Sequence, residues 1–442
     1  MLNIVSRFIA AKRLVALLAF VCIASSVPTP AEAVATTQSM AIPAYEYPTL
    51  TNLWPFIDAN SSQIPFVIVN PASGPGVSTN SDYTTRIAAN NAANIKSIGY
   101  VDTSYQARPY TDVINDIDLW YSLYPGVQGI FLDQVSATGA PALCYSAYIY
   151  NYAKIRHVSD PVMQNFGTYT TPAYEPYGDI FANAEMDHTL YQTWTLPTDG
   201  FQDVAANANR FWHLIHTTDG SDLASTLTQT RNNNAGWVYI TDDILPNPYD
   251  TAPTYGGTEL TDIASLPAST IPNRGITALP AGCLDTTTNA SSTSGTNSVA
   301  FTGSITNQSA IYSLPSDTTS ISFTLPAGVS IANFSGTGWS CSGTTCTYSP
   351  AIAALATSPQ LNVTFTVDCS YQSGTIGATS TVFPNTTSTS QLSVPAASGC
   401  PSAVATTLAS TGDSQYIVIA IGIAMTFMGI TRLWVFRQQT KN

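Results

Sequence analysis

The chain of 442 residues is acidic, with 14 Lys and Arg against 27 Asp and Glu and a net charge of −13. Such a charge repels nucleic acids and other anionic polymers and attracts cationic ones, so the composition argues against a nucleic-acid partner. The length is sufficient for two or three domains.

The first 33 residues have the pattern of a secretory leader. Three basic residues precede a nearly unbroken apolar run over 14–27, and Ala31-Glu32-Ala33 is a small-residue cleavage site. The run is shorter than the ~20 residues that a membrane span needs. We therefore expect a signal peptide over residues 1–33 and an exported mature chain.

Residues 41–275 alternate short apolar runs with helical patterns. The expected strands are 42–45, 65–70, 97–102, 129–133, 162–165, 180–185, 211–216 and 236–241. Apolar residues at helical spacing are clearest at 82–95, 111–124, 142–156 and 221–231. Eight strands alternating with helices over about 230 residues predict a (β/α)8 barrel, whose usual size is ~250 residues.

A doubly wound open sheet is the alternative fold. It would normally bind a nucleotide, but no Gly-x-Gly-x-x-Gly or Walker sequence follows any strand. The segment Asn70-Pro-Ala-Ser-Gly-Pro-Gly looks like a phosphate cradle, yet its two prolines lack amide donors and no Lys follows. The barrel is therefore preferred, and no cofactor is expected.

Polar residues gather where the expected strands end. Asp102 and Asp133 each terminate an apolar run, so each is either a helix cap or a catalytic carboxylate. The strand ends and their surroundings supply Asn70, Tyr100, Asp102, Arg108, Asp133, Gln134, Asn165, Glu185, His216 and Asp242. Carboxylates with amides and aromatic rings suit sugar hydrolysis, in which one carboxyl group protonates the leaving oxygen and another attacks or stabilises the sugar cation.

Other chemistries find less support. No Gly-x-Ser-x-Gly elbow is present, which disfavours a serine hydrolase. His188, His213 and His216 do not form a ligand set, and no Cys-x-x-Cys occurs, so no metal site is expected. In a strand, the spacing of three between His213 and His216 directs them to opposite faces.

Five segments in order resemble the spherulin-4 family. They are Asn70-Pro-Ala-Ser-Gly-Pro-Gly, Gly99-Tyr-Val-Asp-Thr-Ser-Tyr with Arg108, Gly129-Ile-Phe-Leu-Asp, Asn165-Phe-Gly-Thr and Thr241-Asp-Asp-Ile-Leu-Pro-Asn-Pro-Tyr-Asp. The resemblance implies a barrel like that of glycoside hydrolase family 135, related to family 114. Members with known activity are endo-α-1,4-galactosaminidases that cut polymers of N-acetylgalactosamine and galactosamine.

The resemblance also implies roles for site residues. The family has an acidic pair after the fourth strand and a further Glu after the sixth; Asp133 matches the first position and Glu185 the last. Asp133 is then the nucleophile or cation stabiliser and Glu185 the acid/base. Gln134 occupies the second position, where the family usually has a carboxylate. The remaining polar residues at the strand ends, Asn70, Tyr100, Asp102, Arg108, Gln134, Asn165, His216 and Asp242, are expected to bind substrate.

The second half changes character. Residues 276–297 are rich in Ser and Thr and are expected to be a linker. Residues 298–400 show short alternating segments between turns, which predicts a β-sandwich. Leu325-Pro-Ala-Gly-Val-Ser and Gly338-Trp-Ser-Cys-Ser-Gly-Thr-Thr-Cys-Thr-Tyr resemble Ig-like repeats of bacterial surface stalks.

Six cysteines follow the leader, and an even count in an exported chain predicts disulfides. The expected pairs are Cys341–Cys346, Cys369–Cys400 and Cys144–Cys283, although spacing alone does not determine connectivity.

The C-terminus, residues 408–442, has the pattern of an anchor. Leu408-Ala-Ser-Thr-Gly precedes an expected transmembrane helix over 416–436 and a basic tail. Together these resemble a sortase sorting signal, which implies cleavage after Thr411 and attachment to the cell wall; a plain membrane anchor is the alternative. Both place the protein outside the cell.

The sequence therefore predicts a cell-surface glycoside hydrolase that acts on a polysaccharide of N-acetylgalactosamine or galactosamine. One alternative is a non-catalytic adhesin or glycan-binding protein on the same barrel, and another is a structural coat protein. The amide at Gln134 leaves activity open, because Gln cannot transfer a proton but can hydrogen-bond a sugar.

Overall fold

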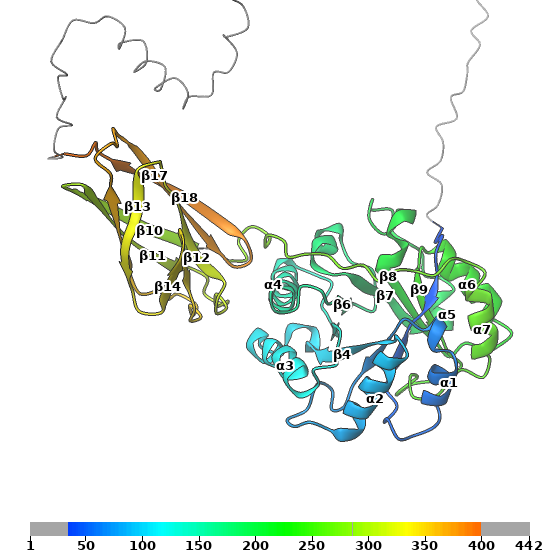
Figure 1. Ribbon diagram of the computed structural model, residues 1–442. Coiled ribbons are helices and arrows are strands. Elements are labelled where there is room, and N and C mark those ends of the chain that lie inside the picture. Colours follow the sequence, from blue (N-terminus) through cyan, green and yellow to red (C-terminus); the bar gives the residue numbers. More distant parts are fainter. Residues whose placement is uncertain (1–33, 285, 399–442) are drawn as a thin grey trace, which may run out of the picture.

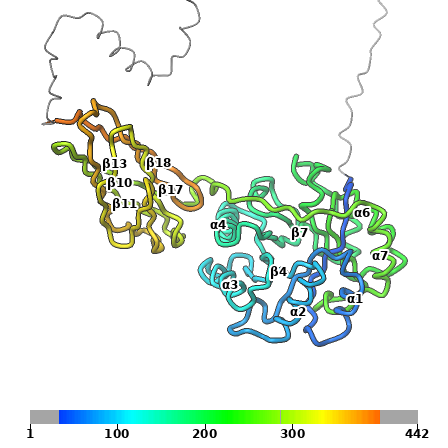
Figure 2. Tube along the Cα trace, in the orientation of Figure 1, coloured from blue at the N-terminus to red at the C-terminus, as the bar shows by residue number. Residues whose placement is uncertain are grey.

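The computed structural model describes residues 34–284 and 286–398, which form two domains (Figures 1 and 2). In the first domain nine parallel strands follow the order β1-β9-β8-β7-β6-β5-β4-β3-β2. Only Ala41 separates β1 from β2, and its N–H donates to Val238 O of β9 at 3.1 Å. The sheet therefore closes into a barrel in which residues 39–44 act as a single strand, as the sequence predicted for the fold.

Strands β2 to β9 lie where the sequence pattern placed them, whereas β1 precedes the first expected strand. The strands are β1 Ser39–Met40, β2 Ile42–Ala44, β3 Phe66–Val69, β4 Lys96–Asp102, β5 Ile130–Asp133, β6 Val162–Asn165, β7 Ile180–Asp187, β8 Phe211–His216 and β9 Trp237–Ile240. Most of their residues are buried; all four of β3, Phe-Val-Ile-Val, are inaccessible. Continuous runs of β-forming residues are expected for parallel strands, because the sheet is covered on both faces.

Helices surround the strands (Figure 1). They are α1 Trp54–Ala59, α2 Ser81–Ala92, α3 Tyr110–Leu123, α4 Ala140–Arg156, α5 His188–Tyr191, α6 Leu223–Asn232 and α7 Gly256–Ile263. The four predicted helices are confirmed as α2, α3, α4 and α6. The connection after β6 departs from a regular (β/α)8 pattern, because its helical segment is the 3₁₀ helix η3, Pro172–Tyr177, with prolines at 172 and 176.

The second domain consists of two antiparallel sheets that share one apolar core. Their orders are β10-β11-β16-β13 and β14-β15-β12-β17-β18. The strands are β10 Thr286–Gly295, β11 Ser298–Asn307, β12 Thr319–Thr324, β13 Val329–Ser335, β14 Trp339–Ser342, β15 Thr345–Tyr348, β16 Leu361–Val367, β17 Gly374–Val382 and β18 Thr386–Val394. Every second side chain of β11 and β16 is buried, which is the alternation that predicted a sandwich.

The linker prediction for 276–297 is wrong over its second part. Residues 286–295 form β10, which pairs with β11 from Thr286↔Asn307 to Gly295↔Ser298. β10 is an edge strand and its side chains are exposed or half-buried, so it lacks the apolar alternation that reveals a strand. Its ladder of backbone hydrogen bonds and its many Thr residues are compatible with a strand all the same.

Two of the predicted disulfides are confirmed. Cys341–Cys346 joins opposite residues of the β14–β15 hairpin. Cys144–Cys283 links α4 of the barrel to the segment that leads into the sandwich. The third predicted pair includes Cys400, which lies outside the described residues.

An aromatic contact joins the domains beside this disulfide. The ring of Tyr148 in α4 stacks on Tyr312 of the sandwich with centroids 4.7 Å apart, and its hydroxyl donates to Ser313 O at 2.5 Å. Tyr110, the first residue of α3, packs against both rings. The sandwich is thereby attached to the side of the barrel formed by α3 and α4 (Figure 1).

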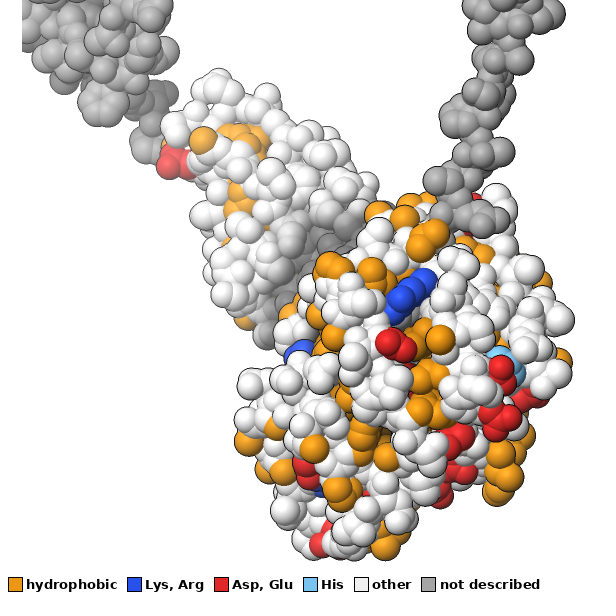
Figure 3. Space-filling view, turned by 90° about the vertical axis from the view of Figure 1, so that its right-hand side faces the viewer, with side chains coloured by type: hydrophobic (Ala, Val, Ile, Leu, Met, Phe, Trp, Pro, Cys, Tyr) orange, Lys and Arg blue, Asp and Glu red, His pale blue; other side chains and the backbone are white. Residues whose placement is uncertain are grey.

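Charge is distributed very unevenly between the domains. Asp317 and Asp368 are the charged side chains of residues 286–398, and the sandwich surface in Figure 3 is almost free of acidic and basic groups. The barrel surface in the same view carries several clusters of acidic side chains. Titratable chemistry is therefore concentrated in the barrel.

The predicted signal peptide and C-terminal anchor lie outside the described residues. Within 34–284 and 286–398, none of the helices has both the length and the apolar character of a membrane span.

Candidate active site

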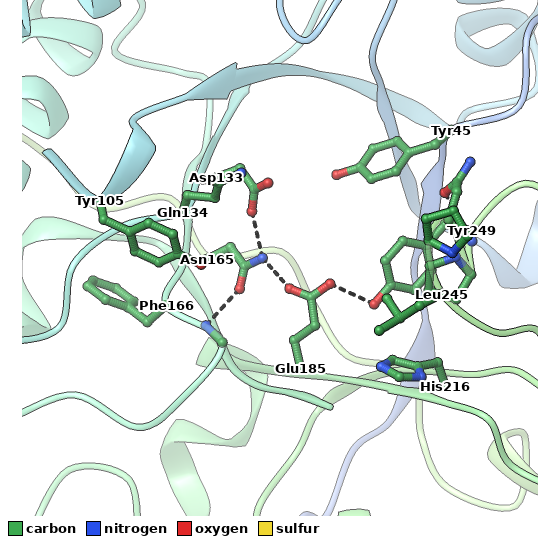
Figure 4. A pocket seen from close by; sticks show the side chains of 14 residues that line it. Tyr45, Tyr105, Asp133, Gln134, Asn165, Phe166, Glu185, His216, Leu245 and Tyr249 are labelled. Carbon is green, nitrogen blue, oxygen red and sulfur yellow. Dashed lines mark hydrogen bonds between the residues drawn. The ribbon is translucent and has the colours of Figure 1, made fainter. Parts of the chain in front are cut away.

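A cavity of about 440 Å³ opens at the carboxyl ends of β5, β6 and β7 (Figure 4). Its lining residues come from these strand ends and from the loops that follow them. They are Tyr45, Tyr105, Asp133, Gln134, Asn165, Phe166, Gly167, Glu185, His216, Leu245, Pro246, Asn247, Pro248 and Tyr249. This edge is where (β/α)8 barrels carry their active sites.

The side chain of Asn165 joins two carboxylates across the floor of this cavity. Its Nδ2 donates to Asp133 Oδ1 at 2.7 Å and to Glu185 Oε2 at 2.5 Å (Figure 4). Because both oxygens accept from the same nitrogen, these two oxygens lie no more than about 5 Å apart. Two acidic side chains 52 positions apart in the sequence thus face the same space.

The orientation of the Asn165 amide follows from the turn after β6. Gly167 N–H donates to Asn165 Oδ1 at 2.9 Å, so Oδ1 is the acceptor and Nδ2 must face the carboxylates. Gly167 has a φ of 64°, a left-handed conformation that glycine adopts without steric cost. The carbonyl of Gly167 in turn accepts from Glu185 N at 3.1 Å, which ties this turn to β7.

Asp133 is held by a second donor from the neighbouring strand. Tyr100 OH of β4 donates to Asp133 Oδ2 at 2.7 Å. Tyr100 is itself positioned by α3, because Trp120 Nε1 donates to Tyr100 O at 2.7 Å. Trp120 packs directly on Gly99, where a Cβ would lie 2.6 Å from the indole ring, so glycine is needed for this approach.

Burial and the neighbouring carboxylate of Glu185 change the pKa of Asp133. Burial and the neighbouring Glu185 carboxylate raise the pKa of Asp133 to about 6, against the opposing effect of hydrogen bonds from Tyr100, Asn165 and the backbone at Gln134. Burial and the Asp133 charge raise the pKa of Tyr100 far above its usual value. Tyr100 is therefore a permanent donor.

Glu185 follows an irregularity in β7. The register between β7 and β8 shifts between Ala182 and Ala184, just before Glu185. Such bulges redirect side chains and are common beside active sites. Tyr249 OH donates to Glu185 Oε1 at 2.7 Å, and burial together with the Glu185 charge raises the pKa of Tyr249 well above its usual value.

Gln134 lines the cavity with an unusual backbone conformation. Its φ is 53°, which is rare for a residue with a side chain and costs free energy. Thr103 Oγ1 and Tyr105 N both donate to its carbonyl, at 2.7 Å each. This turn places Tyr105 and the Gln134 amide at the cavity wall.

The other predicted binding residues divide into two groups. Gln134, Asn165 and His216 line the cavity, and Tyr100 reaches it through Asp133. Asn70, Asp102, Arg108 and Asp242 do not line it.

Local partners occupy the polar groups of the second group. Asn70 accepts from Gly74 N, and Asp102 accepts from the backbone and hydroxyl of Ser104. Arg108 donates to Asp102 O and Asp116, while Asp242 accepts from the backbone and hydroxyl of Thr254. Asp102 thus serves the turn that follows its strand, one of the two roles that its position allowed.

Four aromatic residues of the cavity were not singled out from the sequence: Tyr45, Tyr105, Phe166 and Tyr249. Phe166 directly follows Asn165, and Tyr249 lies within the segment 241–250 that carries the family resemblance. The positions of Phe166 and Tyr249 beside or within these motifs were the sequence signal that could have identified them as cavity residues. Aromatic abundance alone did not distinguish them from core residues.

The histidines have separate environments. His213 is fully buried and its Nδ1 lies 2.7 Å from Tyr191 OH, whereas His216 lies at the cavity. Burial lowers the pKa of His216. Among the described residues, no group of three or more His, Cys, Asp or Glu side chains is arranged to hold a metal ion.

A closed parallel barrel with two carboxylates at the carboxyl ends of its strands is the architecture of a large class of sugar-processing proteins. Residues 39–261, half of the chain, match the family described as spherulation-specific family 4, and the protein belongs to this family. Spherulin-4 of Physarum polycephalum is 32% identical over 212 residues, which cover 46% of this chain and 63% of that protein. The chain thus spans less than two thirds of the length of this curated relative.

Solved structures with partial similarity include two proteins connected with sugars. Sph3 of Aspergillus clavatus, in complex with GalNAc, is 22% identical with a TM-score of 0.44, covering 52% of this chain and 98% of that chain. A glycosyl hydrolase family 2 member from Bacteroides cellulosilyticus is 7% identical with a TM-score of 0.32, covering 81% of this chain and 61% of that chain.

Proposed function

We propose that the protein is a glycoside hydrolase that cleaves an α-linked amino-sugar polysaccharide, with Asp133 and Glu185 as its catalytic carboxyl groups. The observation that carries this proposal is the single nitrogen, Asn165 Nδ2, shared by both carboxylates at 2.7 and 2.5 Å. Inverting enzymes separate their carboxyl groups by ~6.5–9.5 Å to admit a water molecule, whereas retaining enzymes use ~5–5.5 Å. The close approach of the two carboxylates through these oxygens favours the shorter separation, and with it a double displacement with retention.

In this mechanism Asp133 is the nucleophile and Glu185 the acid/base. Glu185 donates a proton to the glycosidic oxygen while Asp133 attacks the anomeric carbon, and the bond to the leaving sugar breaks. Water then attacks the same carbon, Glu185 takes a proton from it, and the ester to Asp133 breaks. The second step restores both carboxyl groups.

The hydrogen bonds at Asp133 suit a nucleophile, which must be ionised to attack. Tyr100, Asn165 and the backbone at Gln134 all stabilise an ionised Asp133. Glu185 is assigned as the acid/base from the family resemblance, and its two oxygens accept hydrogen bonds from Asn165 and Tyr249.

The walls of the cavity can hold a sugar ring. Tyr45, Tyr105 and Phe166 offer aromatic faces, and the Gln134 amide can both donate to and accept from an acetamido group. The family resemblance supplies the substrate class, a polymer of N-acetylgalactosamine or galactosamine of the endo-α-1,4 type. The acidic composition favours a partly deacetylated, cationic polymer.

The protein is proposed to work outside the cell. Two disulfides among the described residues are typical of an oxidising compartment. The expected leader and C-terminal anchor agree with a protein attached to the cell wall or membrane, with the sandwich as an Ig-like spacer between the anchor and the barrel.

A non-catalytic glycan-binding protein is the second candidate. The observation in its favour is Gln134, an amide at the cavity wall where the family usually has a carboxylate. Such a protein would bind the polymer through the same aromatic walls and release no reducing ends.

A digest of α-linked hexosamine polymers separates the two candidates. We expect the purified protein to release new reducing ends from a polymer of N-acetylgalactosamine, galactosamine or both, and the Asp133→Asn variant to bind the polymer without cleaving it. Binding by the wild-type protein with no release from any of the polymers would support the glycan-binding candidate. Absence of both binding and release would contradict both candidates.

A further inference from the structure

A second cavity of about 500 Å³ adjoins the candidate active site. His216 and Leu245 line both cavities, so the two cavities lie side by side. The second cavity is completed by Asp187, Thr189, Leu190, Thr217 and Ile244. Its volume falls in the range of ligand-binding pockets, ~300–1,000 Å³.

The strand order places this cavity on the Glu185 side of the carboxylate pair. Strands β5, β6, β7 and β8 are neighbours in this order, and they carry Asp133, Asn165, Glu185 and His216 respectively. Asp187 lies two residues beyond Glu185 on β7, which places it on the same face about 7 Å further along the strand. Asp133 lies on the opposite side of Asn165.

A carboxylate oxygen in the second cavity is available to a ligand. Asp187 Oδ1 accepts from Leu190 N at 2.9 Å and caps helix α5, while Oδ2 has no hydrogen-bond partner among the described residues. His216 Nδ1 lies 2.9 Å from Thr217 Oγ1, which turns its Nε2 away from that contact. Asp187 Oδ2 can therefore accept a hydrogen bond from a ligand, and His216 Nε2 can accept or donate one according to its tautomer.

Apolar side chains flank these polar groups. Leu190, Ile244 and Leu245 are 60, 59 and 65% exposed, and such surfaces suit the C–H faces of a sugar ring. Thr217 has a φ of 56°, a conformation that is an outlier for a β-branched residue. Backbone strain of this kind is common at ligand sites.

We propose that the second cavity is the leaving-group subsite, which binds the sugar unit on the far side of the cleaved bond, with Asp187 accepting a hydrogen bond from its hydroxyl or amino group. The inference rests on the proposed function: the acid/base protonates the glycosidic oxygen, so the leaving sugar lies on the side of Glu185, where this cavity is found.

The Asp187→Asn variant tests the subsite. Asn caps helices as well as Asp does, so α5 is expected to persist. Two substrates are compared: a hexosamine polymer, whose leaving group is a sugar, and a 4-nitrophenyl α-glycoside of an N-acetylgalactosamine oligosaccharide, whose leaving group is not. The ratio of kcat/KM for the polymer to kcat/KM for the aryl glycoside is expected to fall at least tenfold.

Asp112→Asn is the matched control, because Asp112 is also an acidic residue at the start of a helix but lies outside both cavities. Its ratio should equal that of the wild-type protein. If Asp187→Asn lowers both activities equally, or neither, while the wild-type protein is active, the subsite assignment is wrong and the proposed function stands. If the wild-type protein cleaves neither substrate, both the subsite assignment and the proposed function are wrong.

A transfer experiment identifies the group that Asp187 contacts. With the aryl glycoside as donor, an added saccharide occupies the leaving-group subsite, its hydroxyl oxygen attacks the anomeric carbon, its proton passes to Glu185, and the ester to Asp133 breaks. A greater loss of transfer to galactosamine than to N-acetylgalactosamine oligosaccharides in Asp187→Asn indicates an ammonium contact, and an equal loss of at least tenfold indicates a hydroxyl contact. Unchanged transfer to both acceptors would overturn the proposal.

Discussion

Asp102 and Asp133 end neighbouring strands and lie opposite each other in the β4–β5 register. Each follows a short run of β-forming residues. The carboxylate of Asp102 accepts from Ser104, two positions away, at 2.7 and 2.6 Å. That of Asp133 accepts from Tyr100 and Asn165, which lie 33 and 32 positions away.

This contrast shows how one local sequence pattern supports two roles. Asp102 completes a turn with partners from its own segment, and its charge is used for local structure. Asp133 has partners from two neighbouring strands and shares one of them with Glu185, so its charge is held in a cavity. The distance in sequence to the hydrogen-bond partners distinguishes the two, and only the folded barrel reveals it.

The largest expected effect is on catalysis. Asp133→Asn and Glu185→Gln should each lower kcat/KM on a hexosamine polymer about 10³-fold or more, because a catalytic carboxyl group is removed. Asp102→Asn should change it less than threefold, since Asn can make the same turn contacts. Activity is measured by reducing-end release. Equal losses in the Asp102 and Asp133 variants would show that the two residues do not differ in their roles.

Removing the shared nitrogen should be the next most damaging change. Asn165→Asp places a third carboxylate between the other two, and a like charge raises the pKa of Asp133 further above about 6. We expect about a 10²-fold loss of activity at pH 7 and an acid limb of the pH profile displaced to higher pH. An acid limb that stays in place would show that Asn165 does not control the pair.

Tyr249→Phe should have a smaller effect, about tenfold on kcat. It removes the hydroxyl that donates to Glu185 Oε1, and a hydrogen bond to a charged group contributes ~1.5–3 kcal/mol. Tyr174→Phe is the control, because the Tyr174 hydroxyl donates to Ser136 O away from the carboxylates. A loss in the control as large as in Tyr249→Phe would point to general destabilisation.

Replacing Asp133 should lower the activity but raise the stability of the folded protein. The folded protein holds the Asp133 proton up to about pH 6 against a usual value of 3.8, so it binds this proton more tightly than the unfolded chain does. Stability from this group is therefore fully present below pH 4, falls as the pH rises to about 6, and then stays low. The cost is about 3 kcal/mol.

Asp133→Asn removes this cost, so the variant should melt a few degrees above the wild-type protein at pH 7 and by a much smaller margin at pH 4. Thermal unfolding followed by circular dichroism at both pH values measures the difference. A gain that is equally large at pH 4 would mean that ionisation of the buried Asp133 is not its cause.

The smallest effect is expected at Gln134. Its side chain has no hydrogen-bond partner among the described residues and lines the cavity beside the carboxylates. Gln134→Glu should therefore change kcat/KM less than tenfold. A gain above 10²-fold would mean that a carboxylate at this position takes a direct part in catalysis, as in the usual family pattern.

The fold could be predicted to a large extent because its signals are local. Runs such as Phe66–Val69 are apolar throughout, and the helical pattern before β5 has its apolar residues on one face. β10 was missed because an exposed edge strand depends on its hydrogen-bonded partner rather than on its own apolar pattern.

The candidate site was predictable only in part. Asp133, Asn165 and Glu185 were found because they terminate or follow recognisable strands. Tyr249 was missed because its contact with Glu185 joins residues 64 positions apart and depends on the path of the loop after β9. Arg108 and Asp242 were over-predicted, because local partners that the sequence does not reveal occupy their polar groups.

The anomeric form of the first product tests the central claim most directly. ¹H NMR of an α-linked hexosamine polymer, recorded within the first minutes of digestion, distinguishes the α-anomer from the β-anomer before mutarotation mixes them. Because Asp133 and Glu185 approach each other closely enough to share one nitrogen, we predict retention, so that the α-anomer appears first. Initial release of the β-anomer would contradict it.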